Sequence, residues 1–172
     1  MKKSRLLTIA LAGVLVFLFS SFTALAHGAD RGAAKATIGN AKVSIDYGRP
    51  LLKGRDLMKM LPVGGVWRIG ADAPTAITSN VDLDFGGTRV AKGEHILLTR
   101  LAEPGKWSLV VSAKSANQYE PSARLAEVPL EFRDGNESVE EMTITLTNKD
   151  GRGVIEIAWG TSRLTASFAP AK

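Results

Sequence analysis

Residues 142–147 read Met-Thr-Ile-Thr-Leu-Thr, so that apolar side chains alternate with threonine. Because successive side chains of a β-strand point to opposite faces of the sheet, this alternation predicts a strand with one buried and one exposed face. Similar alternation recurs along the chain in residues 43–47, 81–85, 107–111, 155–159 and 164–168. Glycine- and asparagine-rich turns separate these runs, for example at residues 86–87 and 148–151.

The regular spacing of these runs predicts an all-β fold built as a single antiparallel β-sandwich, with a jelly-roll-like or a barrel-like arrangement as alternatives. Parallel sheets are disfavoured, because their strands are buried on both faces and do not alternate. Residues 134–136 (Asp-Gly-Asn) are expected to form a further turn. Residues 56–61 predict one short helix, and residues 47–75 one long loop. The predicted shared core consists of Val43, Ile45, Leu83, Phe85, Leu109, Ile144, Leu146, Ile157 and Phe168.

The N-terminus has the three parts of an export signal. Basic residues at positions 2, 3 and 5 precede an apolar stretch over residues 6–19, and Ala24-Leu25-Ala26 fits the small-residue cleavage pattern. The apolar stretch is shorter than the ~20 residues that cross a bilayer. We therefore predict cleavage after Ala26, a periplasmic or extracellular location, and no membrane span in the mature protein.

The rest of the chain predicts a single domain. Residues 27–35 are small, polar and rich in glycine and alanine, which indicates a flexible lead-in to a domain over residues 36–172. Loss of the signal removes three cations and leaves 19 basic and 17 acidic residues, a net charge of +2. So small a charge gives no indication of nucleic-acid binding. The absence of cysteine from the sequence excludes disulfides, thiolate metal sites and a cysteine nucleophile.

The loop over residues 47–75 departs from the alternating pattern and contains three short motifs. Tyr47-Gly48-Arg49-Pro50, Lys53-Gly54-Arg55 and Trp67-Arg68-Ile69-Gly70-Ala71 occur in that order. Their residues and spacing resemble the secreted bacterial domain-of-unknown-function family DUF-2911. The resemblance extends more weakly through Val81-Asp82-Leu83, Lys92-Gly93 and Trp107. It implies an exported β-rich domain and no particular activity.

The motifs of this loop also supply the candidate ligand-binding residues, which are Arg49, Lys53, Arg55, Trp67, Arg68 and Asp72. Guanidinium groups are planar forks of donors suited to carboxylate, phosphate or sulfate, and a tryptophan offers a flat stacking surface. We predict that the arginines converge on a small polar or anionic ligand. In the structural alternative, the same cations pair with nearby aspartates or bond loop carbonyls, and Trp67 belongs to the core.

The two histidines allow a separate hypothesis. Cleavage after Ala26 would make His27 the N-terminal residue, followed by Gly28, which resembles the start of secreted copper-dependent polysaccharide monooxygenases. Its amine and imidazole could chelate copper, with His95 as a second imidazole ligand. No metal or other cofactor is otherwise indicated, and the sequence contains no common hydrolase or nucleotide-binding motif.

The sequence therefore favours an exported binding or accessory module of the cell envelope. A secreted copper oxidoreductase that uses His27 and His95 is one alternative, and a purely structural envelope protein is another. The identity of the ligand and the oligomeric state are left open.

Overall fold

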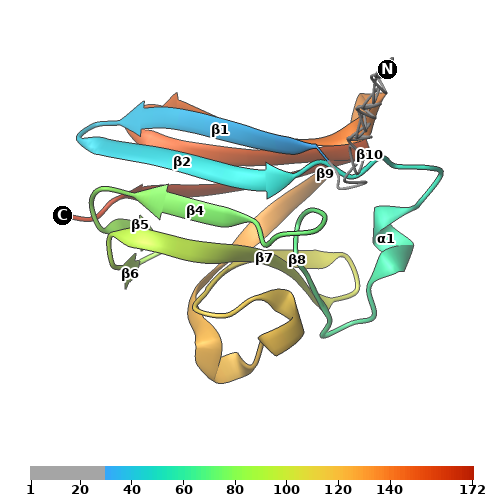
Figure 1. The fold of residues 1–172 in the computed structure, drawn as a ribbon, viewed down its shortest axis with the longest axis horizontal. Coiled ribbons are helices and arrows are strands. Elements are labelled where there is room, and N and C mark those ends of the chain that lie inside the picture. Colours follow the sequence, from blue (N-terminus) through green and yellow to red (C-terminus); the bar gives the residue numbers. More distant parts are fainter. Residues whose placement is uncertain (1–29) are drawn as a thin grey trace, which may run out of the picture.

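The computed structural model describes residues 30–172 and consists almost entirely of β-strands (Figure 1). The strands are β1 (Arg31–Ile38), β2 (Ala41–Gly48), β3 (Val66–Trp67), β4 (Ala76–Ser79), β5 (Leu83–Phe85), β6 (Thr88–Val90), β7 (Gly93–Glu103), β8 (Lys106–Ser112), β9 (Arg124–Lys149) and β10 (Arg152–Pro170). The helices are α1 (Leu57–Met60) and two 3₁₀ turns, η1 (Ala116–Gln118) and η2 (Pro121–Ala123). The described residues contain no helix that is long and apolar enough to cross a membrane.

All pairings between the strands are antiparallel, which confirms the predicted fold class. The strands follow the order β1-β2-β4-β7-β8-β9-β10-β5-β6, and β3 pairs with β7 beside this path. Its two ends, β1 and β6, are not paired with each other, so the sheet is not closed into a barrel.

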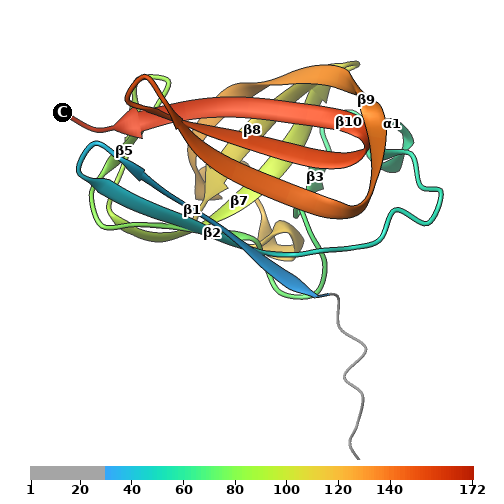
Figure 2. The ribbon, with the colours of Figure 1, turned by 90° about the horizontal axis from the view of Figure 1, so that it is seen from above.

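The long hairpin of β9 and β10 gives the molecule its second layer. The first part of β9 pairs with β8, from Arg124 to Leu130, and the remainder pairs with β10. Seen from above, this hairpin lies over β7 and β8, and β1 and β2 run along one side of it (Figure 2). One strand thus belongs to both layers of the sandwich.

The core lies between the two layers, and every residue predicted for it is buried in one continuous cluster. Ile45, Leu109 and Phe168 are fully buried, and the rings of Phe85 and Phe168 stack with centroids 5.2 Å apart. The alternation of residues 142–147 is also confirmed: Ile144 and Leu146 face the core, whereas Thr145 is exposed. The period-two pattern therefore assigned the faces of the strands correctly.

Two local predictions are wrong. Residues 31–35 do not belong to a flexible lead-in but form the start of β1, where Lys35 pairs with Ser44 of β2. Their small side chains suit an edge strand, and Ala34 is buried against the core. The second error concerns residues 134–136, which do not reverse the chain. They lie within β9. The pairing of β9 with β10 is interrupted beside them and resumes on both sides, so the chain continues in the same direction.

The segment after β2 is attached to the second layer instead of hanging free. Met142 donates a main-chain hydrogen bond to Pro50 O (3.1 Å), and Leu52 donates one to Glu140 O (2.6 Å). A short bridge between Leu51 and Glu141 lies between these two bonds. The predicted helix is present, although α1 has only four residues.

Candidate functional site

An interruption of the β9–β10 ladder creates the irregular surface on which the candidate site is built. Val139 pairs with Gly160 and Asp134 pairs with Ser162, so that residues 135–138 of β9 oppose a single residue of β10. Gly160 has a φ of 58°, a conformation that side chains disfavour. Bulges of this kind bend a strand, redirect its side chains and are frequent beside binding sites.

A cavity of about 480 Å³ lies at this interruption. Its size falls within the range of ~300–1,000 Å³ that is common for small-ligand sites. One wall comes from the bulged parts of β9 and β10, and the other comes from the loop before and at the start of α1. The residues around it are Leu52, Arg55, Asp56, Leu57, Phe132, Asp134, Ser138, Trp159, Gly160, Thr161 and Ser162.

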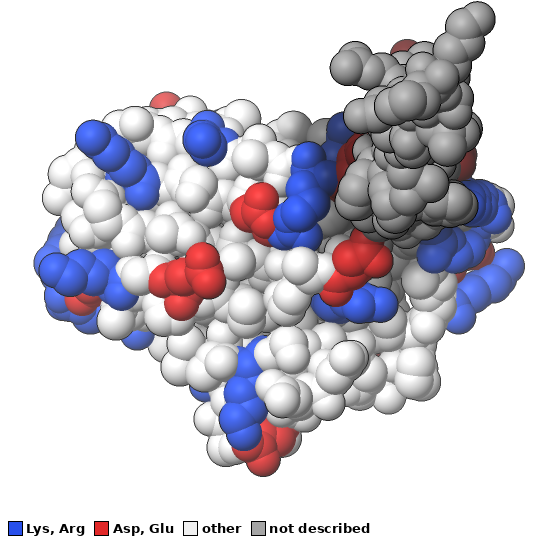
Figure 3. All heavy atoms as spheres, viewed as in Figure 1, with Lys and Arg blue, Asp and Glu red and all other residues white. Residues whose placement is uncertain are grey.

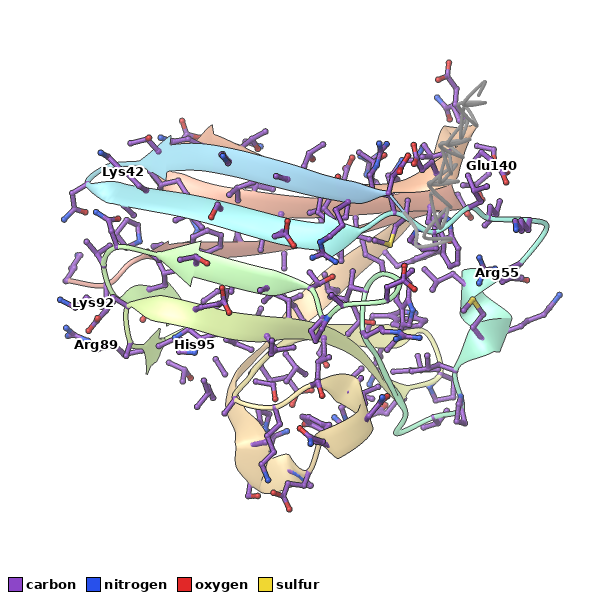
Figure 4. All side chains as sticks on the ribbon, viewed as in Figure 1. Lys42, Arg55, Arg89, Lys92, His95 and Glu140 are labelled. Carbon is purple, nitrogen blue, oxygen red and sulfur yellow. The ribbon has the colours of Figure 1, made fainter. Side chains whose placement is uncertain are left out.

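Arg55 is held in place at the rim of this cavity, beside α1 at one end of the molecule (Figure 4). Its Nε donates a hydrogen bond to Leu52 O (3.1 Å), and Nη2 donates one to Leu51 O. Its Cζ lies 4.8 Å from the centroid of the Trp159 ring, within cation–π distance. No described residue accepts a hydrogen bond from Nη1, so that end of the guanidinium remains available.

Trp159 connects this arginine to the core. Its ring stacks on that of Trp67 with centroids 5.6 Å apart and an interplanar angle of 13°. Both side chains are buried, Trp159 at 1% and Trp67 at 8% exposure, and only Trp159 borders the cavity. Trp67 thus belongs to the core, as the structural alternative predicts, and packs against Trp159.

Arg49 and Lys53 contact the neighbouring part of β9. Arg49 Nη2 lies 2.8 Å from Glu141 Oε2 in an ion pair, and the main-chain nitrogen of Lys53 donates to Glu140 Oε1 (3.1 Å). Neither residue lines the cavity. Their contacts fasten the loop to the second layer, but through glutamates of β9 rather than through the nearby aspartates that the structural alternative names.

Arg68 and Asp72 lie outside the cavity as well. Both are exposed, and Arg68 Nη1 donates a long hydrogen bond to the main-chain oxygen of Asp72 (3.4 Å). The structure thus does not bring Arg49, Arg55 and Arg68 together, and of these three only Arg55 borders the cavity. A ligand-binding role for the six residues stays a prediction.

The charges around the cavity are nearly balanced. The lining contains one guanidinium, that of Arg55, and two carboxylates, those of Asp56 and Asp134. Asp56 forms an ion pair with Lys59 (3.2 Å), and Thr161 Oγ1 donates to Asp134 Oδ1 (3.3 Å). On the wider surface in view, cations and anions are scattered over the molecule with no field of one sign (Figure 3).

Comparison with known proteins identifies the family. The model of the family described as "Protein of unknown function (DUF2911)" matches residues 30–168. The chain belongs to this family. The match confirms the predicted family and covers nearly all described residues. No curated protein and no solved structure matches the chain.

The motifs that resemble DUF2911 have clear roles in the fold. Tyr47 donates a buried hydrogen bond from its hydroxyl to Ile144 O (3.2 Å), across the two layers. Gly48 packs so closely on the third motif that a Cβ there would lie 2.1 Å from Ala71 O. Thr75 Oγ1 donates a hydrogen bond to the main-chain oxygen of Ile69 (2.6 Å). Ile69 itself has a φ of 48°, in the left-handed region. The first and third motifs therefore interlock and fix the loop.

Of the two histidines in the copper hypothesis, the structure describes only His95. His27 lies outside the described residues, and His95 Nε2 is 2.7 Å from Ala91 O. His95 lies far from Arg55, toward the opposite end of the molecule (Figure 4). Within residues 30–172, no group of three or more histidine, aspartate or glutamate residues is arranged to hold a metal ion.

Sequence reasoning missed most of the cavity. The sequence pattern predicts Trp159 only as one position of an alternating strand, and Asp134 only as part of a turn. The missed lining residues with polar side chains are Asp134, Ser138, Thr161 and Ser162. Gly160, in the middle of a strand pattern, was the one local signal of a bulge. It follows Trp159 directly and marks the place where the ladder breaks.

A second polar cluster links the side chains of β7, β8 and β9 to one another. Glu127 accepts hydrogen bonds from Ser108 Oγ (2.5 Å), Arg100 Nη1 (3.1 Å) and Arg124 Nη1. Burial raises the pKa of Glu127, but the hydrogen bonds from Ser108, Arg124 and Arg100 outweigh burial, so that its pKa lies below its usual value. The carboxylate is thus saturated with donors within the protein and joins three neighbouring strands.

Proposed function

We propose that this protein is an exported binding module of the cell envelope that holds a small polar ligand in the cavity between Arg55 and the β9–β10 bulge. The observation that carries the proposal is the position of Arg55. Two main-chain carbonyls and the ring of Trp159 fix its guanidinium, while Nη1 has no acceptor among the described residues. A donor that is preorganised in this way binds a ligand without a further loss of side-chain freedom.

The composition of the walls favours this cavity over a hollow of similar volume on β1 and β2. A hollow of about 510 Å³ on the outer face of β1 and β2 is lined only by Lys35, Ala36, Thr37, Lys42, Val43 and Ser44. It lacks an aromatic side chain and a carboxylate. The cavity at the bulge combines apolar side chains with a guanidinium, carboxylates and hydroxyls from separate segments, which is the usual make-up of a ligand site.

Export is the second part of the proposal. It rests on the basic, apolar and small-residue parts of positions 1–26. The test is N-terminal sequencing of the protein recovered from the cell envelope or the medium. We expect it to begin at His27 or within a few residues, and recovery of intact Met1 in the membrane fraction would contradict cleavage.

Ligand binding is tested by thermal unfolding in the presence of sugars, amino acids, carboxylates, phosphate and copper. A molecule that binds only the native state raises the melting temperature. The cavity is then blocked by Thr161→Tyr, a substitution at an exposed lining position. The matched control is Thr88→Tyr on β6, which is equally exposed and lies outside the cavity.

The binding proposal expects at least one compound to stabilise the wild type and Thr88→Tyr but not Thr161→Tyr. If no compound stabilises the wild type, or if Thr161→Tyr responds like the control, the cavity is not a ligand site. The second outcome would favour a purely structural role for the loop.

A further inference from the structure

We infer that the ligand of this cavity is uncharged and rich in hydroxyl groups, with the chemistry of a sugar or a polyol. The inference rests on the proposed function, because it concerns the same cavity. Its basis is the combination of groups around the cavity rather than any single residue.

The charges of the walls argue against a charged ligand. An anion that approaches Arg55 also approaches Asp56 and Asp134, and a cation that approaches these carboxylates also approaches Arg55. The nearby Lys59 pairs with Asp56. Since attraction and repulsion largely cancel, a net charge on the ligand gains little Coulomb energy and still has to be desolvated.

The hydrogen-bonding character of the walls favours hydroxyl groups. A guanidinium can only donate and an ionised carboxylate can only accept, whereas a hydroxyl does both. A ligand with several hydroxyls can therefore accept from Arg55 and donate to Asp134. Ser138, Thr161 and Ser162 add three hydroxyl side chains to the lining, and these can act in either direction.

The apolar part of the lining matches the remaining surface of such a ligand. Leu52, Leu57, Phe132 and Trp159 contribute apolar or aromatic groups to the same cavity. A sugar ring has C–H faces and a polar rim, so it can place its faces against these side chains and its rim against the polar ones. Because the ring of Trp159 stacks on Trp67, lies against Arg55 and is only 1% exposed, the apolar contact available to the ligand comes chiefly from the half-buried side chains of Leu52 and Phe132.

The experiment measures binding of neutral mono- and disaccharides and polyols by calorimetry or equilibrium dialysis, in parallel with carboxylates, phosphate and amines. We expect a neutral compound to bind with an affinity that changes little when the salt concentration is raised, because screening acts only on charges. Thr161→Val should weaken this binding about threefold to tenfold, the effect of losing one hydrogen bond. Thr88→Val, outside the cavity, should leave it unchanged.

The possible failures are distinguishable. If a carboxylate, phosphate or amine binds and is excluded by Thr161→Tyr, while neutral compounds do not bind, the ligand class is wrong and the proposed site stands. If nothing in either panel binds, the proposed function fails together with the inference. If a sugar binds equally well to Thr161→Tyr, it occupies another surface and the inference is overturned.

Discussion

The most direct structural prediction concerns Arg163, which holds the bulge together from the side of β10. The residue is only 9% exposed. Its Nη1 donates to Gly160 O and Ser162 O (both 3.0 Å), and its Nη2 donates to Glu137 O (2.8 Å). The guanidinium therefore connects the two bulged segments that form one wall of the cavity. We predict that Arg163→Met destabilises the protein and loosens this wall.

The expected magnitude follows from the three hydrogen bonds. A hydrogen bond from a charged donor contributes about 1.5–3 kcal/mol, but the three bonds share one group and are not additive. Loss of a buried cation also recovers part of its desolvation cost, which offsets some of the loss. We therefore expect the free energy of unfolding to fall by about 3 kcal/mol in Arg163→Met.

The assay is urea unfolding near neutral pH, followed by tryptophan fluorescence. Arg152→Met is the control, because Arg152 lies on the same strand, is exposed and makes one hydrogen bond, to Ser167 Oγ. We expect the control to lose well under about 1 kcal/mol. Arg163→Lys keeps the charge but not the planar fork, and should lie between the two. Wild-type stability in Arg163→Met, or an equal loss in Arg152→Met, would refute the assigned role.

Three further predictions test the core, the half-buried carboxylate of Glu127 and the interlocked loop. Leu146→Ala should lower the free energy of unfolding by about 2–5 kcal/mol and Thr145→Ala by far less, since only Leu146 faces the core. Equal losses in the two variants would show that the buried and exposed faces of β9 are wrongly assigned. Because the pKa of Glu127 is lowered in the folded state, its contribution is present above the unfolded-state pKa and is lost as the pH falls through the folded-state pKa. Glu127→Gln should therefore be less stable than the wild type near neutral pH and should approach it in strongly acidic solution, and a difference that does not change with pH would be inconsistent with this reasoning. Gly48→Ala should cost about 3 kcal/mol, because the added methyl group meets Ala71 O, and a variant as stable as the wild type would show that the loop can shift at no cost.

The sequence was sufficient for the fold class because the information lies in local alternation. Val43 and Ile45 or Ile144 and Leu146 share a face whatever their partners are, since the period of a strand is two. The error at residues 134–136 has the opposite origin. Asp-Gly-Asn has the chemistry of a turn, and only the opposing strand β10 decides that the chain continues as a bulge.

The candidate site was only partly predictable for the same reason. Arg55 was identified from a motif in its own segment, but its neighbour in space, Trp159, lies 104 positions further along the chain. Arg49 looked equally suited to a ligand, and its partner Glu141 could not be assigned without the pairing of the loop with β9. Composition indicates which groups are present, whereas long-range strand pairing decides which of them meet.

The central claim is that a small, hydroxyl-rich ligand occupies the cavity at the β9–β10 bulge. It is tested most directly by an NMR titration of the ¹⁵N-labelled protein with the neutral compound that stabilises it most. Trp159 Nε1 is buried and has no acceptor among the described residues, so its indole signal is a sensitive reporter of a change at the cavity wall. We predict saturable shifts confined to this signal, the amides of Gly160–Ser162 and the Arg55 side chain. Shifts that centre on another surface, or no saturable shift at all, would contradict the account.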